Sequence, residues 1–322
     1  MKAVLCKEFG APLFIGDVEP RPLEAGQVRV AVAACGINFP DTLIIDGKYQ
    51  FRPDLPFSPG GEIAGEVIEV GPDVAGYAVG DPVIAVTLWG GFAEQVIAAP
   101  VQLMHRPAAM EPVTAAAFSM TYGTSYHALR QRAALQPGET LLVLGAAGGV
   151  GLAAVELGRE MGASVIAAAS SEEKLALARD YGAAETINYA QGPLKDQIKA
   201  LTGGRGVDVI YDPVGGDLGA EAVRGLAWNG RLLIIGFASG TIQQIPANLP
   251  LLKGASVVGV FWGAFREKQP EVEAENFRQL FAWHGEGRLK PLISETFPLE
   301  RAAEALSALS DRKALGKLVL TV

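Results

Sequence analysis

Seven consecutive small residues, GAAGGVG from Gly145 to Gly151, interrupt an otherwise apolar stretch and have the composition of a phosphate-binding loop. Ala146, Gly148 and Gly151 fit the pattern G-x-G-x-x-G, with alanine at the first glycine position. In such a loop the second glycine lets the backbone approach a pyrophosphate, and the third lets the following helix pack tightly on the preceding strand. The first N–H groups of that helix are unpaired and attract phosphate. We therefore predict a dinucleotide-binding loop; the alternative is a tight packing turn without a ligand. The residues expected at the cofactor are Ala146, Ala147, Gly148, Gly149 and Val150.

The end of the next apolar run, SVIAAAS at residues 164–170, bears on which dinucleotide is bound. NAD-binding units usually carry Asp or Glu at this tip to hold the ribose 2′-hydroxyl. Here the tip is Ser170, and Lys174 follows one helical turn later, where it can meet a 2′-phosphate as a point charge. We therefore favour NADPH and predict that Ser170 and Lys174 bind it. The alternatives are that Ser170 and Glu173 form a helix-capping box and that Lys174 lies on a solvated helix face.

These segments belong to a long region in which apolar runs alternate with helical patterns. Such alternation indicates parallel strands joined by crossover helices, because parallel neighbours need a long connection. Six strands at this spacing predict a doubly wound α/β sheet. The runs are TLLVLG (140–145), SVIAAAS (164–170), ETINY (185–189), VDVIYDPV (207–214), GRLLIIGF (230–237) and ASVVGVFW (255–262).

The start of the chain has a different texture, with β-rich runs separated by glycine and proline. VRVAVAA, GEIAGEVIEV and DPVIAVTLWGGFAEQVIAA predict a compact β-barrel-like domain. Helical patterns at Glu271–Gly285 and Leu299–Ser310 and a last strand, KLVLTV, are expected to rejoin this domain. We thus predict a first domain of residues 1–122 and 264–322 and a dinucleotide-binding domain of residues 123–263.

Composition narrows the range of partners. The 322 residues carry a formal net charge of −8, which disfavours a nucleic acid or an anionic membrane as the main partner. No stretch approaches the ~18 uninterrupted apolar residues of a membrane span. The N-terminal segment lacks the long apolar core of a secretory signal, and the two cysteines, Cys6 and Cys35, give no disulfide framework. We expect a cytoplasmic protein that binds neither nucleic acid nor membrane.

Several separated motifs together resemble one known family. GINFPDTLIIDGKY (36–49), FSPGGEIAGEVIEVG (57–71), the AAGGVG loop and the closing GKLVL are similar to the medium-chain dehydrogenase/reductase superfamily, and within it to the zinc-free quinone oxidoreductases. The resemblance extends over essentially the whole chain, although Glu156 stands where the family usually has glutamine. It implies a GroES-like catalytic domain, a Rossmann domain and a cofactor held in the cleft between them.

The resemblance also bears on metal binding. Metal-dependent relatives carry a zinc-ligand cysteine two residues after Gly36 and a histidine in a G-H-E motif; this chain has Asn38 and Gly61 at those positions. Cys35 is out of register with the ligand position and is interpreted as a small buried hydrophobic residue. Two cysteines in total cannot form the four-cysteine structural zinc lobe of those relatives. We predict that no zinc is bound.

A reductase of this kind without a metal needs an acceptor whose product anion is already delocalised, such as a quinone or an α,β-unsaturated carbonyl compound. It then requires only hydrogen-bond donors near the carbonyl oxygen and a source of protons. The resemblance places Asn38 near the nicotinamide as a donor and Tyr49 there as a donor or a gate. The alternatives are a turn residue for Asn38 and an aromatic side chain packed on the barrel for Tyr49. Asp41 and Glu62 are expected to be structural carboxylates of the first domain.

The resemblance assigns further cofactor contacts by position. Thr124 matches a threonine near the nicotinamide, Tyr189 matches a tyrosine at the 2′-phosphate and adenosine, and Lys317 lies in the closing GKLVL motif. Three apolar residues lie at the carboxyl ends of predicted strands, where open α/β sheets bind ligands. These are Val214, Phe237 and Phe261, for which simple packing is the alternative.

Together these features predict an NADPH-dependent reductase of a small quinone or activated alkene. An enoyl-thioester or 2-alkenal reductase of the same superfamily is the alternative enzyme, and a non-catalytic NADPH-binding protein is the alternative outside catalysis.

The apolar segment ASVVGVFWG (255–263) is expected to be the last strand of the open sheet, with no lysine or proline to protect its edge. We therefore expect a homodimer formed through this strand; in the alternative, residues 264–270 cover the edge and the chain stays monomeric.

Overall fold

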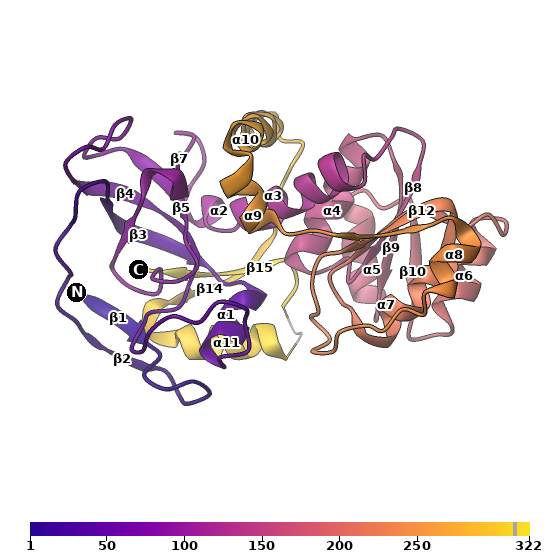
Figure 1. The fold of residues 1–322 in the computed structure, drawn as a ribbon, viewed down its shortest axis with the longest axis horizontal. Helices are drawn as coiled ribbons and strands as arrows, with labels where there is room; N and C mark the ends of the chain where they lie inside the picture. Colours follow the sequence, from indigo (N-terminus) through magenta and orange to yellow (C-terminus); the bar gives the residue numbers. More distant parts are fainter. Residues whose placement is uncertain (312–313) are drawn as a thin grey trace. The chain divides into compact units, whose positions relative to one another are not determined.

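The computed structural model describes residues 1–311 and 314–322 and divides the chain into two compact units. The first unit comprises residues 1–120 and 293–322, and the second comprises residues 121–292. Figure 1 shows both termini in the first unit, where the yellow C-terminal segment returns to the indigo N-terminal strands. No helix in the described ranges is long and apolar enough to cross a bilayer.

The first unit is built on a seven-stranded sheet in the order β14-β15-β3-β4-β5-β7, with β6 paired to β3, and on a separate β1-β2 hairpin. The strands are β1 (Lys2–Leu5), β2 (Phe14–Asp17), β3 (Val28–Gly36), β4 (Glu62–Val70), β5 (Pro82–Val86), β6 (Gln95–Ala98), β7 (Leu103–His105), β14 (Ile293–Pro298) and β15 (Lys317–Thr321). The helices are α1 (Phe39–Ile45), α2 (Pro112–Ala115) and α11 (Ala302–Ser310), with 3₁₀ turns η1 (Pro100–Gln102) and η4 (Leu299–Arg301). β15 pairs antiparallel with β3, so the end of the chain completes the sheet begun near its start.

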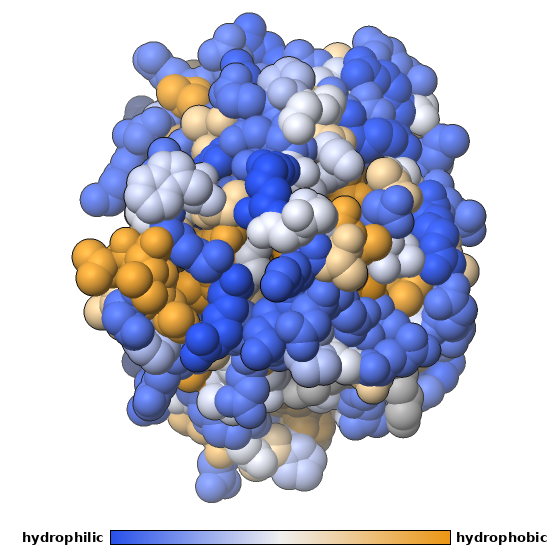
Figure 2. All heavy atoms as spheres, turned by 90° about the vertical axis from the view of Figure 1, so that its right-hand side faces the viewer, coloured by the Kyte–Doolittle hydropathy of each residue, from blue (hydrophilic) through white to orange (hydrophobic). Residues whose placement is uncertain are grey.

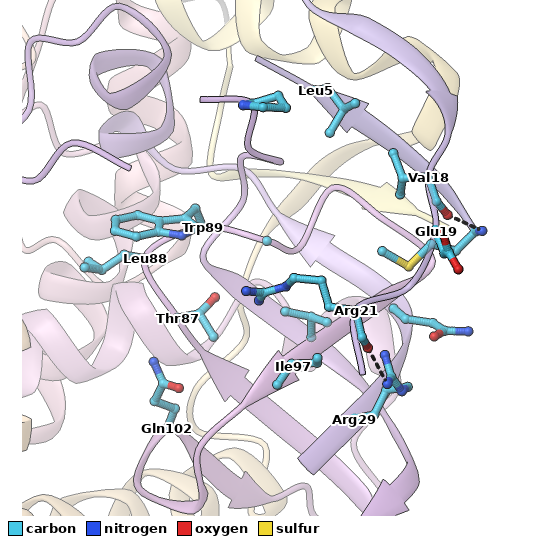
Figure 3. A pocket seen from close by; sticks show the side chains of 15 residues that line it. Leu5, Val18, Glu19, Arg21, Arg29, Thr87, Leu88, Trp89, Ile97 and Gln102 are labelled. Carbon is cyan, nitrogen blue, oxygen red and sulfur yellow. Dashed lines mark hydrogen bonds between the residues drawn. The ribbon is translucent and has the colours of Figure 1, made fainter. Parts of the chain in front are cut away.

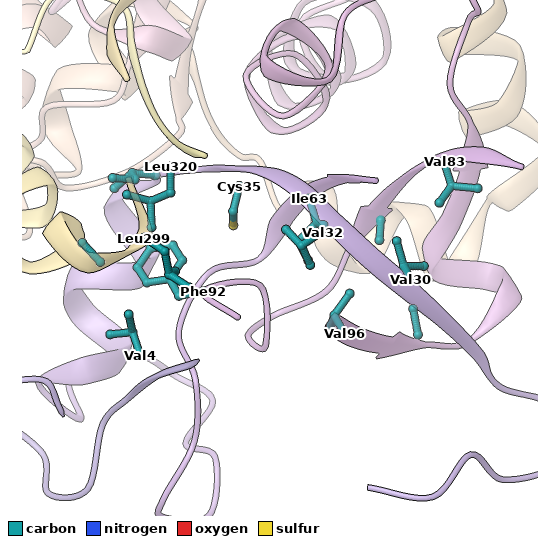
Figure 4. Packing of buried hydrophobic residues seen from close by; sticks show 14 of the residues in the cluster. Val4, Val30, Val32, Cys35, Ile63, Val83, Phe92, Val96, Leu299 and Leu320 are labelled. Carbon is teal, nitrogen blue, oxygen red and sulfur yellow. The ribbon is translucent and has the colours of Figure 1, made fainter. Parts of the chain in front are cut away.

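The central strand of this sheet follows from its residues. β3 reads VRVAVAACG, and β-branched side chains favour a strand because they pack well on a pleated surface. Val30 and Cys35 of β3 pack with Ile63 of β4 and Leu320 of β15 in one apolar core (Figure 4). This core fixes the end of β3 at Gly36, directly before the polar residues of the candidate site.

The second unit contains a six-stranded parallel sheet in the order β10-β9-β8-β11-β12-β13. The strands are β8 (Thr140–Leu144), β9 (Ser164–Ala169), β10 (Glu185–Asn188), β11 (Val207–Asp212), β12 (Leu226–Ile234) and β13 (Ser256–Gly259). The helices and helical turns are α3 (Ser119–His127), whose first two residues belong to the first unit, η2 (Ala128–Arg132), α4 (Gly149–Glu160), α5 (Glu172–Asp180), α6 (Leu194–Leu201), α7 (Gly216–Ala222), η3 (Val223–Gly225), α8 (Asn248–Lys253), α9 (Trp262–Lys268) and α10 (Pro270–Gly285). The predicted doubly wound α/β sheet is confirmed.

The strand order reverses between β8 and β11. The chain runs outward from β8 through β9 to β10 and then returns to β11 on the other side of β8. The loops after β8 and β11 therefore leave the carboxyl edge of the sheet in opposite directions, which creates the crevice where open α/β sheets bind ligands. Leu142, Leu144, Ile210 and Leu232 pack in the apolar core that holds the strands beneath this crevice.

Residues 264–292 lie in the second unit, whereas the sequence placed them in the first domain. His127 of α3 stacks on Phe265 of α9, with ring centroids 3.9 Å apart. Tyr126 of α3 meets the Trp283 ring of α10 edge-on at 5.9 Å. The sequence pattern indicated a helix in this segment but not its packing partner. The aromatic contacts with α3 place α9 and α10 in the second unit.

β13 forms an edge of the parallel sheet: within the described part of the chain it pairs with β12 alone. Ser256, Val257 and Gly259 are exposed along it. α9 follows directly, but it buries its own Trp262 and Phe265 and leaves those strand residues uncovered.

Candidate functional site

The glycine loop follows β8 and begins α4 at the crevice. Gly148 is the N-cap of α4, with a backbone conformation (φ −80°, ψ 170°) that any residue adopts. Among the described residues, a β-carbon built on Gly148 meets only the Gly145 carbonyl oxygen, at 3.5 Å, which is an ordinary contact. On Gly151 the same carbon falls 2.3 Å from that oxygen and 2.9 Å from Ala146 Cα. The packing of α4 on the loop thus requires Gly151, whereas no contact within residues 1–311 and 314–322 requires a glycine at position 148.

The N-terminus of α4 at Gly148 is suited to bind an anion such as a phosphate. The first turn of α4 has no acidic residue, and its N-cap has no side chain to accept from the first N–H groups. Those N–H groups and the helix dipole favour an anion. The side chains of Ala146 and Ala147 are buried, while Gly149 and Val150 are partly exposed. With 0% and 3% of their residue surface exposed, the two alanines offer a ligand little surface of either backbone or side chain.

Ser170 and Tyr189 adjoin at the tip of β9, and Lys174 follows in the first turn of α5. Ser170 is exposed directly after the strand, and Tyr189 is held beside it because its N–H donates to the Ala169 carbonyl at 3.2 Å. Ser171 is the N-cap of α5 and accepts from the Lys174 N–H at 3.4 Å. The capping alternative for Ser170 is therefore wrong, and the Ser170 side chain stays at the strand tip, directly before the helix that carries Lys174.

A buried carboxylate that the sequence did not single out organises the loop after β11. Asp212 is fully buried, and its Oδ1 accepts from the N–H groups of Val214 at 2.9 Å and Gly215 at 2.8 Å. Its Oδ2 accepts from the Gln243 amide at 3.1 Å. Burial raises the pKa of Asp212, and the two backbone N–H groups counteract that rise. Asp212 thereby fixes the loop that carries Val214; an acid at the carboxyl end of a predicted strand, where open sheets bind ligands, was the available signal.

Val214 and Phe237, predicted from two different strands, lie on connected loops. The Ser239 N–H donates to the Val214 carbonyl at 2.9 Å. Gly215 adopts a positive φ of 69°, and a β-carbon there would fall 2.9 Å from the Phe237 ring. Val214 also borders the glycine loop, since a β-carbon at Gly145 would fall 3.0 Å from it. The loops after β8, β11 and β12 thus come together at one edge of the sheet.

Thr124 and Phe261 adjoin one close contact between α3 and α9. A β-carbon at Gly123 would fall 2.6 Å from the Trp262 ring, so the two elements pack tightly there. Thr124, partly exposed, follows Gly123, and the half-exposed Phe261 precedes Trp262. Glu273 of α10 fixes the ring by accepting from its indole N–H at 2.6 Å, and burial raises the pKa of Glu273 to about 7. Sequence reasoning did not find Glu273.

In the first unit, Asn38 stands between a lysine and a glutamate. It precedes α1, and its Oδ1 accepts from Lys317 Nζ at 2.6 Å. Its Nδ2 donates to Glu62 Oε2 at 2.9 Å and to the Gly36 carbonyl at 3.2 Å. Lys317 Nζ also donates to Glu62 Oε2 and to the Ile37 carbonyl, both at 2.9 Å. Asn38, Glu62 and Lys317 therefore form a closed hydrogen-bonded triangle.

Glu62 is the most enclosed member of this triangle. Its side chain is 0% exposed, and that of Lys317 is 6% exposed. The second carboxylate oxygen, Oε1, accepts from Ser119 Oγ at 2.9 Å and from the Met120 N–H at 2.7 Å. Gly36 must lack a side chain, because a β-carbon there would fall 1.8 Å from a backbone carbonyl oxygen and 2.8 Å from Glu62 Oε2. The ion pair is thus buried, with both carboxylate oxygens hydrogen-bonded.

Asp41 and Tyr49 lie on α1 and in the loop after it. Asp41 is buried, and its Oδ2 accepts from the Asn38 backbone N–H at 2.7 Å. Burial raises the pKa of Asp41 to about 7, against the opposing effects of that hydrogen bond and of the Lys317 charge. Burial and the charge of Asp41 raise the pKa of Tyr49. Tyr49 packs in a small apolar cluster with Trp89, and no hydrogen bond within the described residues links its hydroxyl to Asn38.

The residues at the zinc-ligand positions do not fit a zinc ion. Zinc in proteins is held by thiolate, imidazole or carboxylate ligands. Asn38 offers an amide that already bonds Lys317, and a β-carbon at Gly61 would fall 2.6 Å from the Thr87 carbonyl oxygen, which leaves no room for a ligand side chain. Cys35 lies in the apolar core, where burial raises its pKa well above the usual range. No three His, Cys, Asp or Glu side chains are grouped as metal ligands in the described ranges.

A separate cavity of about 540 Å³ opens in the first unit. Figure 3 shows Leu88 and Trp89 on one side of it and Val18 and Glu19 on the other. Thr87 contributes a buried hydroxyl without a hydrogen-bond partner among the described residues. No member of the hydrogen-bonded triangle lines this cavity, so it is distinct from the site built around that triangle.

Two family models match the chain. The model described as "Alcohol dehydrogenase GroES-like domain" matches residues 24–108, and the one described as "Zinc-binding dehydrogenase" matches residues 149–279. Quinone oxidoreductase-like protein 2 of Bos taurus is 44% identical over 322 residues, which cover 100% of this chain and 92% of the relative. Quinone oxidoreductase of Homo sapiens is 33% identical over 327 residues, which cover 99% of this chain and 97% of the relative.

Solved structures show the same likeness in three dimensions. The quinone oxidoreductase of Escherichia coli, solved in complex with NADPH, is similar with a TM-score of 0.92 at 28% identity, over 100% of both chains. The quinone oxidoreductase of Thermus thermophilus, also solved in complex with NADPH, is similar with a TM-score of 0.87 at 36% identity, again over 100% of both chains. The sequence match and the structural likeness both extend over the entire chain.

Proposed function

Because the chain belongs to the quinone oxidoreductase-like family of the medium-chain dehydrogenase/reductase superfamily, we propose that it is an NADPH-dependent reductase of quinones or similarly conjugated carbonyl compounds. The observation that carries this proposal is the space at Gly148. A β-carbon there would make one ordinary contact, although the loop around it is otherwise closely packed. This space lies at the N-terminus of α4, beside the crevice of a parallel sheet, where a pyrophosphate binds in such folds.

The tip of β9 favours NADPH over NADH. Ser170 is exposed there, and the strand carries no acidic residue to hold a ribose 2′-hydroxyl. We assign the 2′-phosphate to Ser170, Lys174 and Tyr189, because a hydroxyl and an ammonium group donate to phosphate oxygens. The Escherichia coli and Thermus thermophilus relatives were solved with NADPH, which supports this choice.

When bound, NADPH supplies a hydride; the protein must hold the acceptor and deliver a proton to the oxygen that gains charge. Of the two predicted catalytic side chains, Asn38 already donates both of its amide hydrogens to protein acceptors. We therefore assign proton donation to the Tyr49 hydroxyl. A tyrosine hydroxyl is protonated at neutral pH, and because burial and the nearby Asp41 raise the pKa of Tyr49 further, it gives up its proton only to an oxygen that has already gained charge.

We propose that the reaction needs no metal. A quinone accepts a hydride without a Lewis acid because the resulting anion is delocalised over the ring, and the zinc-ligand positions hold Asn38 and Gly61. Exhaustive chelation should leave turnover unchanged, and elemental analysis should find less than one zinc per chain. A stoichiometric zinc ion whose removal abolishes turnover would refute this part of the proposal.

A panel of acceptors at fixed NADPH concentration separates the candidate substrates. Fastest turnover with a simple quinone supports the proposal. Turnover confined to a 2-alkenal or an enoyl thioester would identify the alternative enzyme of the same superfamily. Saturable NADPH binding without turnover of any acceptor would identify a non-catalytic NADPH-binding protein.

We also propose that the protein is a homodimer joined through β13. Val257 on this edge is 45% exposed, and Leu251 and Leu252 of α8, which precedes the strand, are 77% and 71% exposed. Figure 2, viewed from the side of the second unit, shows apolar side chains gathered in a patch on that face. Antiparallel pairing of two β13 strands about a two-fold axis would continue the sheet and remove an unprotected edge.

A further inference from the structure

We infer that the buried Lys317–Glu62 ion pair positions Asn38 so that its amide accepts a hydrogen bond from a ligand and donates none. This inference rests on the proposed binding of NADPH. It reverses the role predicted for Asn38, which was donation to the carbonyl oxygen of the substrate. It also makes Glu62 and Lys317 positioning residues that act on the ligand through Asn38.

The charges on either side of Asn38 dictate the orientation of its amide. An ammonium group only donates hydrogen bonds, and a carboxylate only accepts them. Lys317 Nζ therefore requires Oδ1 on its side, at 2.6 Å, and Glu62 Oε2 requires Nδ2 on its side, at 2.9 Å. Turning the amide by half a rotation would place two donors face to face and two acceptors face to face. The ion pair thus holds the amide in a single orientation.

The capacity left to Asn38 follows from the bonds it already makes. Nδ2 has two hydrogens, and it donates one to Glu62 Oε2 and the other to the Gly36 carbonyl. Oδ1 has two lone pairs, of which Lys317 takes one. Because Asn38 is partly exposed, the second lone pair is the group that it offers to a ligand. A hydroxyl or N–H group of NADPH fits this acceptor, whereas the anionic oxygen of a reduced quinone would be repelled.

Lys317 also uses all of its hydrogen-bond donors within the protein. Its three N–H groups go to Ile37 O, Asn38 Oδ1 and Glu62 Oε2, and its side chain is 6% exposed. A direct contact with the cofactor, which its place in the GKLVL motif predicted, would break one of these bonds. The influence of Lys317 on a ligand therefore passes through Asn38.

Stability alone gives little reason to bury this ion pair. Burying two charges removes their hydration, and replacing such a pair with apolar groups is often neutral or stabilising. What apolar groups cannot do is distinguish the two ends of an amide. The specific contribution of Glu62 and Lys317 is therefore the direction in which Asn38 points.

A double-mutant cycle on NADPH binding tests the inference. Glu62→Gln preserves the shape of the side chain but replaces a group that only accepts with one that can also donate, so that only Lys317 still fixes the orientation of the Asn38 amide. We expect the Kd for NADPH to rise about tenfold, the size of one net hydrogen bond, and Asn38→Leu to give a similar rise. In the Asn38→Leu background, Glu62→Gln should change Kd by less than about twofold, because the amide that Glu62 orients is no longer present. Independent tenfold effects that multiply would overturn the inference.

Glu69→Gln is the matched control, because it makes the same change on the same strand, β4. Glu69 accepts from the Arg29 side chain at 2.7 Å and belongs to no part of the candidate site. The Kd of the Glu69→Gln variant for NADPH should stay within about twofold of the Kd of the original protein. A rise equal to that of Glu62→Gln would show a general disturbance of β4 and would overturn the inference. If Glu62→Gln fails to fold, the double variant Glu62→Met/Lys317→Met removes both charges together. Its Kd for NADPH should be about tenfold higher than that of the original protein. Unchanged NADPH binding in the folded double variant would count against the inference.

A second readout does not depend on NADPH. In ¹⁵N-labelled protein, the Asn38 side-chain amide hydrogens should exchange slowly with solvent, because both are hydrogen-bonded, and Glu62→Gln should speed their exchange at least tenfold. Fast exchange in the original protein would overturn the inference even if NADPH binds. Conversely, slow exchange in a protein that binds no NADPH would leave the orientation of Asn38 intact and refute the proposed function.

Discussion

One added methyl group should have opposite consequences at two glycines of the loop. Gly151→Ala places a β-carbon 2.3 Å from the Gly145 carbonyl oxygen and 2.9 Å from Ala146 Cα, and neither backbone atom can rotate away. Overpacking costs about 1–3 kcal/mol, and contacts with backbone belong at the upper end of that range. The higher helix propensity of alanine offsets about 0.5–1 kcal/mol. We expect the free energy of unfolding to fall by about 2 kcal/mol.

Gly148→Ala adds the same methyl group where the nearest non-neighbouring atom of the described residues is 3.5 Å away and the backbone suits alanine. The folded state should lose only about 0.5 kcal/mol, because alanine is a poorer N-cap than glycine. The methyl group occupies the space assigned to the pyrophosphate, so the Kd for NADPH should rise at least tenfold, and Gly148→Val should abolish binding. Denaturant unfolding and NADPH titration measure the two effects separately. Normal NADPH binding by Gly148→Val would show that the loop is a packing turn and refute the reasoning.

Three further predictions concern pH, coenzyme choice and assembly. The folded-state pKa of Glu273, about 7, lies above its usual 4.5, so the stability that this carboxyl contributes is complete below pH 4.5 and is lost as the pH rises through 7. Glu273→Gln should therefore be more stable than the original protein at pH 8 by about 3 kcal/mol in denaturant unfolding, and equal stabilities at that pH would contradict this. Lys174→Ala should weaken NADPH binding by about 1–2 kcal/mol and leave NADH binding unchanged; equal affinities for both coenzymes in the original protein would exclude the assigned phosphate contact. Light scattering should give twice the 33.7 kDa chain mass, and a single-chain mass after Val257→Lys; a dimer that persists would place the interface elsewhere.

Local patterns predicted the second unit well. The glycine loop, the strand before it and the helix after it are contiguous, so their spacing alone indicated the turn and its place at the edge of the sheet. The cap of α5 shows the limit of such patterns. Ser170 and Ser171 are both reasonable N-caps, and the structure selects Ser171 because β9 ends at Ala169.

Non-local contacts were beyond the sequence. Glu62 and Lys317 are 255 positions apart, and they meet only because β15 pairs with β3 and β3 pairs with β4. The sequence therefore indicated Asn38 as a site residue but not which of its atoms are already bonded. Asp212 and Glu273 bond over shorter separations, 31 positions to Gln243 and 11 positions to Trp262, but each bond still joins separate elements whose packing the sequence did not reveal.

Hydride transfer from NADPH to a quinone tests the proposed function most directly. The protein is mixed with a known amount of NADPH and an excess of a simple quinone, without oxygen and with a metal chelator, and the products are quantified. We predict one NADP⁺ and one hydroquinone for each NADPH consumed, at a rate that the chelator does not change. Binding of NADPH without its oxidation, or oxidation that requires added zinc, would contradict the proposed function.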